Sequence, residues 1–188
     1  MLIKKIQLFI EQFKFFIDDY KKLSGSKKPR MLYIWLGRVS VGILFFRFDR
    51  AMYLLLGRVW TVFRILFYPV ITLTNVYSNI EVNYKAEIGP GLTILHPALG
   101  VVITGSVKIG KNFTLVGGNV IAGKAMINGA KFVIGDNVVL GANAIILGPC
   151  TVSDHTVLGA SALVNKDTKN EAVMVGVPAK DINHKENV

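Results

Sequence analysis

The stretch "VIGDNVVLGANAIILG", residues 133–148, repeats an aliphatic residue at every sixth position. Ile134, Leu140 and Ile146 mark the repeat, and glycine follows the first two. A helix repeats its buried face about every 3.6 residues and a strand every second residue, so a period of six fits neither element alone. Hexapeptide spacing is typical of a β-helix, a solenoid of short parallel strands with aliphatic residues pointing into its core.

The six-residue spacing extends in both directions from this stretch. Its aliphatic positions are Val76, Val82, Ile88, Ile94, Ile103, Ile109, Leu115, Ile121, Ile134, Leu140, Ile146, Val152, Leu158 and Val164. Small or β-branched residues often follow four positions later, at Val107, Val138, Ala144, Cys150, Thr156 and Ala162. With three flat sides to each coil, the pattern predicts a mainly β fold, a parallel β-helix of about five coils.

Two interruptions break this register. The first adds three residues between Ile94 and Ile103 and contains His96. The second adds one residue to two repeats and covers residues 123–131, "GKAMINGAK". Insertions in solenoids form loops on one face and often build the functional site, so we expect the site near one or both of them.

The N-terminal region has a different character. Residues 1–80 carry 13 Lys and Arg against 4 Asp and Glu, a net charge of +9, whereas residues 81–188 carry +1. An apolar stripe at helical spacing runs through Leu2, Ile6, Phe9, Phe13, Phe16, Tyr20 and Leu23, with the charges off it. We expect further helices over residues 31–68, broken near Phe48 and Asp49. The sequence thus predicts a basic, amphipathic helical region (1–75), a β-helix domain (76–182) and a polar tail (183–188).

The basic helices indicate an anionic partner. Lys and Arg interleaved with aromatic residues suit a membrane interface, so residues 1–70 are expected to lie on a membrane rather than cross it. The longest uncharged run in the N-terminal region, Ile65–Ile80, contains Pro69 and falls short of the ~20 apolar residues that span a bilayer. Packing of these faces on one another or on a partner subunit remains the alternative. We expect no nucleic-acid partner because no recognised motif is present. A single cysteine, Cys150, excludes an intramolecular disulfide.

Three stretches carry a resemblance to a known family: "IGPGLTILHPALGVVI" (88–103), residues 133–148, and "VMVGVPAKDI" (173–182). At these residues the sequence resembles the hexapeptide-repeat acyltransferases, closest to their serine acetyltransferase branch, over residues 80–182. The resemblance implies a left-handed β-helix, a homotrimer, and acetyl-CoA as acyl donor in grooves between adjacent subunits.

The resemblance places the family's catalytic histidine at His96 and its acidic partner at Glu81, where the serine enzymes typically have aspartate. The residue types suit the chemistry, because a neutral imidazole near pH 7 accepts a proton from a hydroxyl that attacks a thioester. A carboxylate orients such a ring and favours the imidazolium. The alternatives are a core histidine bonded to a backbone carbonyl and a solvated carboxylate.

The coenzyme site is also implied by the resemblance. Small residues at coil corners, at Gly123, Ala142 and Ala160, would let the pantetheine arm lie against the backbone. Lys124 and Lys180 are candidates for the phosphates, with solvated surface lysines as the alternative. The three histidines of the chain give no close ligand pair, so no metal site is expected.

The sequence departs from the serine enzymes where they grip an amino acid. Leu95 replaces the aspartate before the catalytic histidine, and Ala130 and Lys131 stand near the place of an Arg-His pair. These losses predict an acetyl-CoA-dependent O-acetyltransferase acting on a sugar hydroxyl of a surface polysaccharide or its lipid-linked precursor. Such an enzyme is expected in the cytoplasm, peripheral at the inner face of the bacterial cytoplasmic membrane. Three alternatives remain: a serine O-acetyltransferase, an N-acyltransferase of amino-sugar nucleotides, and a non-catalytic β-helix scaffold.

Overall fold

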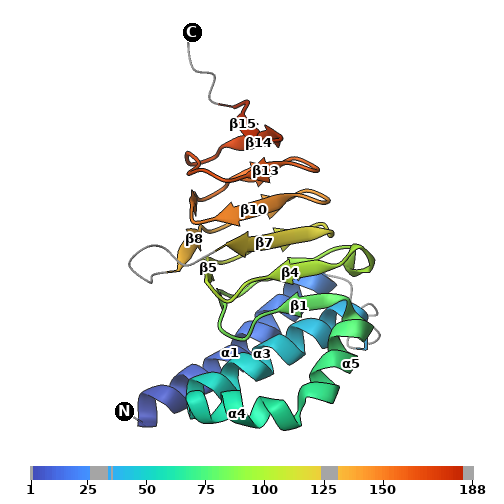
Figure 1. Cartoon of the computed structure of the whole chain (residues 1–188), viewed down its shortest axis with the longest axis vertical. Helices are drawn as coiled ribbons and strands as arrows, with labels where there is room; N and C mark the ends of the chain where they lie inside the picture. Colours follow the sequence, from blue (N-terminus) through green and yellow to red (C-terminus); the bar gives the residue numbers. More distant parts are fainter. Residues whose placement is uncertain (1, 26–33, 35, 124–130, 184–188) are drawn as a thin grey trace.

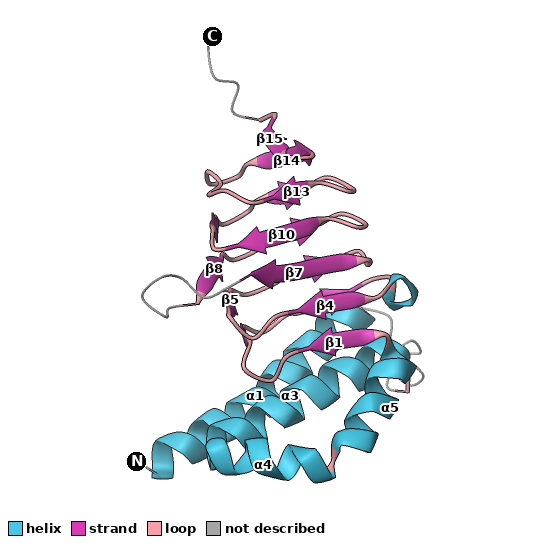
Figure 2. Ribbon diagram, viewed as in Figure 1, coloured by secondary structure: helices cyan, strands magenta, loops and turns pink. Residues whose placement is uncertain are grey.

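A base of helices carries a stack of short strands in the computed structural model of the chain, which describes residues 2–25, 34, 36–123 and 131–183 (Figure 1). The helices are α1 (Leu2–Ser24), α3 (Arg38–Leu56), α4 (Arg58–Leu66) and α5 (Tyr68–Ser78). They lie at the end of the stack opposite β14 (Val173–Gly176) and β15 (Ala179–Asp181) (Figure 2). The predicted architecture, a parallel β-helix preceded by an α-helical region, is confirmed.

The strands form three parallel sheets, one on each face of a prism. The first face holds β1 (Ile80–Val82), β4 (Val101–Ile103), β7 (Asn119–Gly123), β10 (Ile145–Gly148) and β13 (Leu163–Val164). The second holds β2 (Glu87–Ile88), β5 (Val107–Ile109), β8 (Phe132–Ile134) and β11 (Thr151–Val152). The third holds β3 (Thr93–Ile94), β6 (Thr114–Leu115), β9 (Val139–Leu140), β12 (Val157–Leu158) and β14 (Val173–Gly176), with β15 (Ala179–Asp181) added antiparallel to β14. The faces therefore contain between four and five stacked coils.

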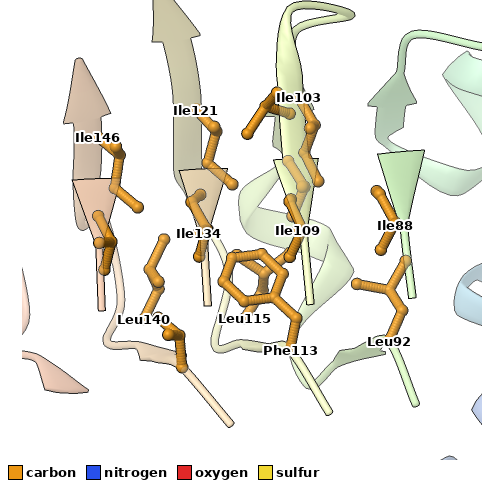
Figure 3. Packing of buried hydrophobic residues seen from close by; sticks show 14 of the residues in the cluster. Ile88, Leu92, Ile103, Ile109, Phe113, Leu115, Ile121, Ile134, Leu140 and Ile146 are labelled. Atoms are coloured by element: carbon orange, nitrogen blue, oxygen red, sulfur yellow. The ribbon is translucent and has the colours of Figure 1, made fainter. Parts of the chain in front are cut away.

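The repeat positions fill the interior of this prism (Figure 3). From Ile88 to Val164 every one of them is at most 5% exposed. Parallel registry places Ile103, Ile121 and Ile146 opposite one another in adjacent strands. Since neighbouring strands lie about 4.8 Å apart, equivalent side chains stack in contact along the axis. The six-residue period thus arises because each face of each coil contributes one of these inward repeat positions.

Side chains at the coil corners hold consecutive coils together. The residues Asn112, Asn137, His155 and Glu171 occupy equivalent corners and all adopt the left-handed conformation, with φ between 57° and 59°. The short polar side chain of asparagine tolerates this conformation better than most residues do. Asn112 Nδ2 donates a hydrogen bond to Asn137 Oδ1 over 3.1 Å, which links two coils directly.

The predicted start of the repeats at Val76 is wrong. Val76 lies in α5 and is 71% exposed, because the helix continues to Ser78. Asn79, in the left-handed conformation at φ 57°, ends the helix, and the first inward residue is Ile80 in β1. The boundary between helices and solenoid therefore lies at residue 79 rather than between residues 75 and 76.

The predicted break near Phe48 and Asp49 is also wrong, since α3 runs through both residues to Leu56. Asp49 is buried within α3 and acts as a hydrogen-bond acceptor. Its Oδ1 accepts hydrogen bonds from Trp60 Nε1 (2.7 Å) and Arg64 Nε (3.1 Å), which tie α4 to α3. The helix ends instead at Gly57, whose φ of 62° suits glycine.

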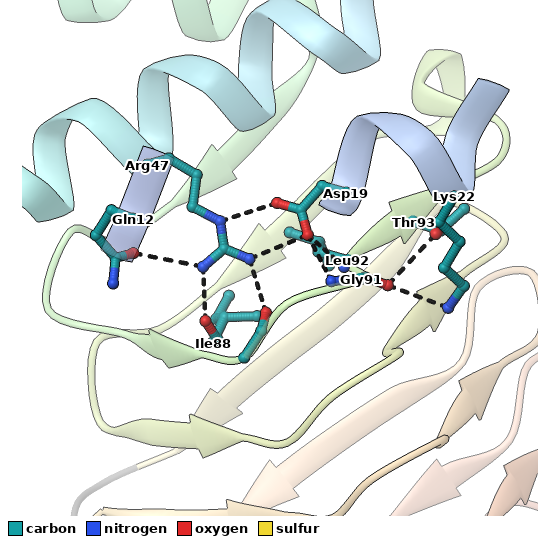
Figure 4. Close-up of polar contacts among 9 residues, drawn as sticks. Gln12, Asp19, Lys22, Arg47, Ile88, Gly91, Leu92 and Thr93 are labelled. Atoms are coloured by element: carbon teal, nitrogen blue, oxygen red, sulfur yellow. Dashed lines mark hydrogen bonds and ion pairs between the residues drawn. The ribbon is translucent and has the colours of Figure 1, made fainter. Parts of the chain in front are cut away.

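A buried arginine joins the helical base to the first coil (Figure 4). Arg47 of α3 donates from Nε to Asp19 Oδ2 of α1 over 2.9 Å. Its Nη1 and Nη2 donate to the backbone carbonyls of Ile88 (2.6 Å) and Gly89 (2.7 Å) in the first coil. The guanidinium thus bonds to both helices and the solenoid.

Asp19 completes the same junction. Its Oδ1 accepts hydrogen bonds from the backbone N–H groups of Gly91 and Leu92, each 2.7 Å long. One turn away, Lys22 Nζ donates to the carbonyls of Gly91 (3.1 Å) and Asn112 (3.0 Å), and so reaches the second coil. The polar side of α1 therefore contacts the solenoid instead of facing solvent throughout.

Candidate active site

His96 lies on the outside of the solenoid, at the corner between the third and first faces. It precedes the 3-10 turn η1 (Pro97–Leu99), which fills the first interruption between β3 and β4. Its backbone N–H donates to the carbonyl of Val116 in the next coil over 2.8 Å, while its side chain is exposed. The alternative of a core histidine is therefore wrong, and the imidazole is accessible to a substrate.

The loop that carries His96 is anchored to the start of the first strand. Asn79 Nδ2 donates to the carbonyl of Ala98 over 3.0 Å, and the Asn79 carbonyl accepts from Val101 N–H over 3.1 Å. Gly100 closes the loop with φ 82°, and its N–H donates to the Pro97 carbonyl over 2.9 Å. These bonds tie η1 to Asn79, which precedes Glu81 by two residues in the chain.

Glu81 lies in the middle of β1, with its side chain exposed on the outer surface of the first face. It lines a cleft of about 390 Å³ between β1 and helices α3, α4 and α5, with the Asp49–Arg64 ion pair on the opposite wall. His96 does not line this cleft. The loop anchor brings the two predicted catalytic residues to adjoining elements, but no hydrogen bond joins their side chains in the part of the chain that the structure describes.

The corner occupied by His96 recurs in every coil above it. Registry aligns Ile94, Leu115, Leu140, Leu158 and Met174 on the third face. Two positions further along, the corresponding corner residues are His96, Gly117, Ala142, Ala160 and Gly176, which we call the small-residue column. At about 4.8 Å per coil, Ala160 lies roughly 14 Å along the axis from His96. Two of the three small residues predicted to flank the coenzyme thus stand in line with the predicted base.

Position 117 requires glycine because the backbone at His96, in the neighbouring coil, lies too close for a side chain. Its φ is 138°, and a β-carbon there would lie 2.3 Å from the carbonyl oxygen of His96. The backbone of the second coil therefore approaches the His96 backbone more closely than any side chain permits. Gly117 is itself buried, with Leu99 also close to it, so the packing of the His96 loop on the next coil explains this glycine.

The remaining predicted coenzyme residues lie elsewhere. Gly123 ends β7 at the opposite edge of the first face, where a β-carbon would lie 2.5 Å from the Gly148 carbonyl oxygen, so coil packing explains this glycine. Lys180 is exposed on β15 opposite Val175, one position from the top of the small-residue column. Lys124 lies outside the described residues. The structure therefore brings Lys180, but not Gly123, toward the corner of His96.

The structure describes two of the positions at which the sequence departs from the serine enzymes, Leu95 and Lys131. Leu95 is half-exposed beside His96, so an apolar group stands where those enzymes have a carboxylate. Lys131 Nζ lies 3.0 Å from Glu87 Oε1 and also bonds to the Lys85 carbonyl, on the second-face side of the solenoid. Burial lowers the pKa of Lys131, while Glu87 opposes that shift. Ala130 lies outside the described residues.

Sequence reasoning missed Asn79 as the residue that holds the His96 loop. The signal was present, since an asparagine between a helical run and an aliphatic strand is a common left-handed helix end. Among the described residues, no group of three or more His, Cys, Asp or Glu side chains is arranged to hold a metal ion.

The family model for bacterial transferase hexapeptide (six repeats) matches residues 133–166. No curated protein sequence matches the chain. Among solved structures, the serine acetyltransferase of Neisseria gonorrhoeae is similar with a TM-score of 0.75 and 25% identity over 92% of this chain. The chain spans 65% of that enzyme's length.

Two further serine acetyltransferases share the fold. The soybean enzyme complexed with serine has a TM-score of 0.75 at 23% identity, and the match covers 92% of this chain and 70% of the soybean chain. Serine acetyltransferase 1 of Entamoeba histolytica has a TM-score of 0.72 at 18% identity, covering 90% and 66% of the two chains. Since about nine-tenths of this chain is covered, the likeness includes the helical base as well as the solenoid.

Proposed function

We propose that this chain, which carries hexapeptide repeats and the fold of the serine acetyltransferases, is an acetyl-CoA-dependent O-acetyltransferase with His96 as its general base. The observation that supports this best is the small-residue column. An exposed imidazole stands at one end of a line of small corner residues, of which Ala142 is half-buried and Ala160 and Gly176 are exposed. A long, narrow donor such as acetyl-CoA fits along such a line, with Lys180 near its far end for a phosphate.

The chemistry is direct acyl transfer. His96 accepts the proton of the acceptor hydroxyl as its oxygen attacks the thioester carbonyl carbon. The bond between that carbon and sulfur breaks, and the departing thiolate takes the proton from the imidazolium. An acetyl ester and free coenzyme A result, and His96 returns to its neutral form. Glu81 is proposed to favour the imidazolium through its negative charge, as a positioning residue.

The acceptor has two candidates. Likeness to the serine acetyltransferases favours serine over the sugar hydroxyl expected from the sequence. One observation keeps the sugar hydroxyl as the second candidate. Leu95 presents an apolar side chain beside His96, and Lys131 is engaged with Glu87, so neither offers a charge-matched contact to both ends of an amino acid.

A homotrimer is part of the proposal, since the His96 corner lies on the outer surface of the solenoid. A neighbouring copy packed along this edge would turn the exposed column into a groove that shields the thioester from water. Sedimentation velocity tests the trimer directly. A chain that stays monomeric at the concentrations at which it is active would contradict this part of the proposal.

The test of the activity is thioester consumption with serine, amino-sugar nucleotides and acetylatable glycans offered separately. We expect His96→Ala to lose about 10²–10⁴-fold in kcat, the range that general-base catalysis supplies. His155→Ala is the matched control, because that histidine is exposed at another corner of the solenoid. Equal turnover by His96→Ala and wild type would refute the assignment. Absence of any thermal stabilisation by millimolar acetyl-CoA would favour a scaffold instead.

A further inference from the structure

Helices α4 and α5 present a large apolar surface that nothing in the described chain covers. Seven aliphatic side chains on them are each more than half exposed, and Leu66 is the most exposed at 76%. The seven, which we call the elbow surface, are Val59, Val62, Ile65, Leu66, Val70, Leu73 and Val76. Contiguous exposed apolar surface of this kind marks an interaction site rather than ordinary protein surface.

The shape of this surface suits shallow insertion into a bilayer. No single helix among the described residues is long and apolar enough to cross a membrane. Together α4 and α5 meet the length and composition required, but they are bent by 80° at the break between them. At about 1.5 Å per residue each helix is roughly 14–17 Å long, against ~30 Å for the hydrocarbon core. A bent pair of this size reaches the acyl region without spanning it.

Three hydroxyl side chains of α5 are hydrogen-bonded within the helix. The hydroxyls of Thr72, Thr74 and Ser78 donate to the backbone carbonyls four residues earlier, over 2.8–3.0 Å. The helix contains no charged residue. Hydroxyls bonded in this way need no water partner, which lowers the cost of placing the helix in an apolar medium.

The charges around the elbow surface match an anionic partner. Between residues 36 and 78 the chain has one acidic residue, Asp49, and it is buried against Arg64. Arg58, at the start of α4, and Arg38, whose Nε bonds to the Tyr77 carbonyl, are exposed beside the apolar side chains. Exposed Tyr68 and Tyr77 are of the type enriched at membrane interfaces. Exposed arginines and tyrosines flanking an aliphatic surface fit a layer of anionic headgroups above acyl chains.

We propose that the α4–α5 elbow inserts into the interfacial region of a bilayer that contains anionic phospholipid. The proposal narrows membrane contact from the whole basic region to residues 58–78. Helix α1 also exposes apolar side chains, Leu2 and Ile3 among them, but it carries the exposed acidic residues Glu11 and Asp18, whereas α4 and α5 contain no acidic residue. Helix α5 leads through Asn79 into β1 and the loop of His96, and it also lines the cleft at Glu81. A bound bilayer therefore lies next to the candidate site. Lipid binding itself does not depend on the proposed acetyl transfer.

Vesicle co-sedimentation tests the proposal, with phosphatidylcholine vesicles compared with vesicles containing phosphatidylglycerol. We expect wild type to bind the anionic vesicles, and Leu66→Glu and Leu73→Glu each to lose binding at least about tenfold, because each places a charge in the acyl region. Ile182→Glu is the matched control, an exposed aliphatic residue at the far end of the solenoid. Unchanged binding by both elbow variants, or no binding by wild type, would overturn the proposal.

A second measurement separates lipid from a protein partner. An environment-sensitive dye on Leu73→Cys should brighten with anionic vesicles, and labelling is selective because Cys150 is buried. Light scattering without lipid should give all variants the same mass. Suppose instead that the wild type is an oligomer, that the elbow variants have a lower mass, and that the dye fluorescence does not change with vesicles. The surface would then be an interface between copies of the chain, and the proposal would be overturned. Acetylation of a soluble acceptor, measured on the same proteins, should be unchanged, so loss of lipid binding is distinguishable from failure of the proposed function.

Discussion

The guanidinium of Arg47 and the carboxylate of Asp19 lie 2.9 Å apart, and their side chains are 0% and 1% exposed. The pair is buried where α1 and α3 meet the first coil, and each member also bonds to the coil backbone. A charge removed from water so completely is tolerated only while its partner and its hydrogen bonds remain. The helical base and the solenoid are therefore joined by a polar contact in which the loss of either partner leaves the other charge buried and unpaired.

Arg47→Met should destabilise the protein strongly. The substitution leaves the Asp19 carboxylate buried without its counter-charge and removes the donors to Ile88 and Gly89. Breaking a buried pair in this way costs about 3–5 kcal/mol in the free energy of unfolding. Urea unfolding followed by circular dichroism measures the loss. Arg58→Met, an exposed arginine at the start of α4, is the control and should change stability by no more than about 0.5 kcal/mol.

The buried thiol of Cys150 makes the free energy of unfolding depend on pH, in a direction that follows from its pKa. Burial, with a smaller contribution from Asp167, raises the pKa of Cys150 from 9.0 to about 11. As pH rises from 9.0 toward 11, the thiol of the unfolded chain ionises while that of the folded chain keeps its proton. The free energy of unfolding therefore falls across this window, by an amount approaching about 3 kcal/mol.

Cys150→Ala isolates this contribution from other groups that titrate at high pH. Urea unfolding of both proteins at steps from pH 8 to pH 11 should give curves that converge as pH rises, because only wild type loses stability through the thiol. Parallel curves for the two proteins would show that the thiol has the same pKa in both states.

Both the register of the solenoid and the relative face of each anchor could be predicted from the sequence. His96, Ala142 and Ala160 each follow a repeat anchor by two residues, and so does Gly123. The first three follow anchors on the third face, whereas Gly123 follows Ile121 on the first. Counting anchors in threes from Ile94 reaches Leu115, Leu140 and Leu158 and passes over Ile121, so with three faces to a coil the spacing already assigns Gly123 to another corner.

The long-range contacts of the helical base could not be predicted from the sequence. Asp19 and Arg47 are 28 residues apart on different helices, and each looks like a solvated charge in its local sequence. The sequence predicts a break near Phe48 and Asp49 because the acceptor role of Asp49 depends on Trp60 and Arg64, which lie in the next helix. Val76 fits the six-residue register by coincidence, since a single aliphatic residue in a helix carries no period of its own.

Glu81→Gln tests the positioning role of the carboxylate. The amide keeps the size of the side chain but cannot favour an imidazolium by charge, so we expect kcat to fall about tenfold with little change in the KM for acetyl-CoA. Glu81→Asp keeps the charge and should retain more activity than the glutamine variant. Glu87→Gln, a carboxylate paired with Lys131 on another face, is the control. Equal kcat values for Glu81→Gln and wild type would remove Glu81 from the mechanism.

Ala160→Leu tests whether the small-residue column holds the donor. Ala160 is exposed, so a larger side chain fits without disturbing the core, but it covers the bare backbone about 14 Å from His96. We expect the KM for acetyl-CoA to rise at least about tenfold, as obstruction of a close-fitting site predicts, while the KM for the acceptor stays constant. Asn165→Leu adds the same side chain to an exposed position after β13, outside the column, and should leave both constants unchanged. If Ala160→Leu behaves like that control, the coenzyme lies along a different edge of the solenoid.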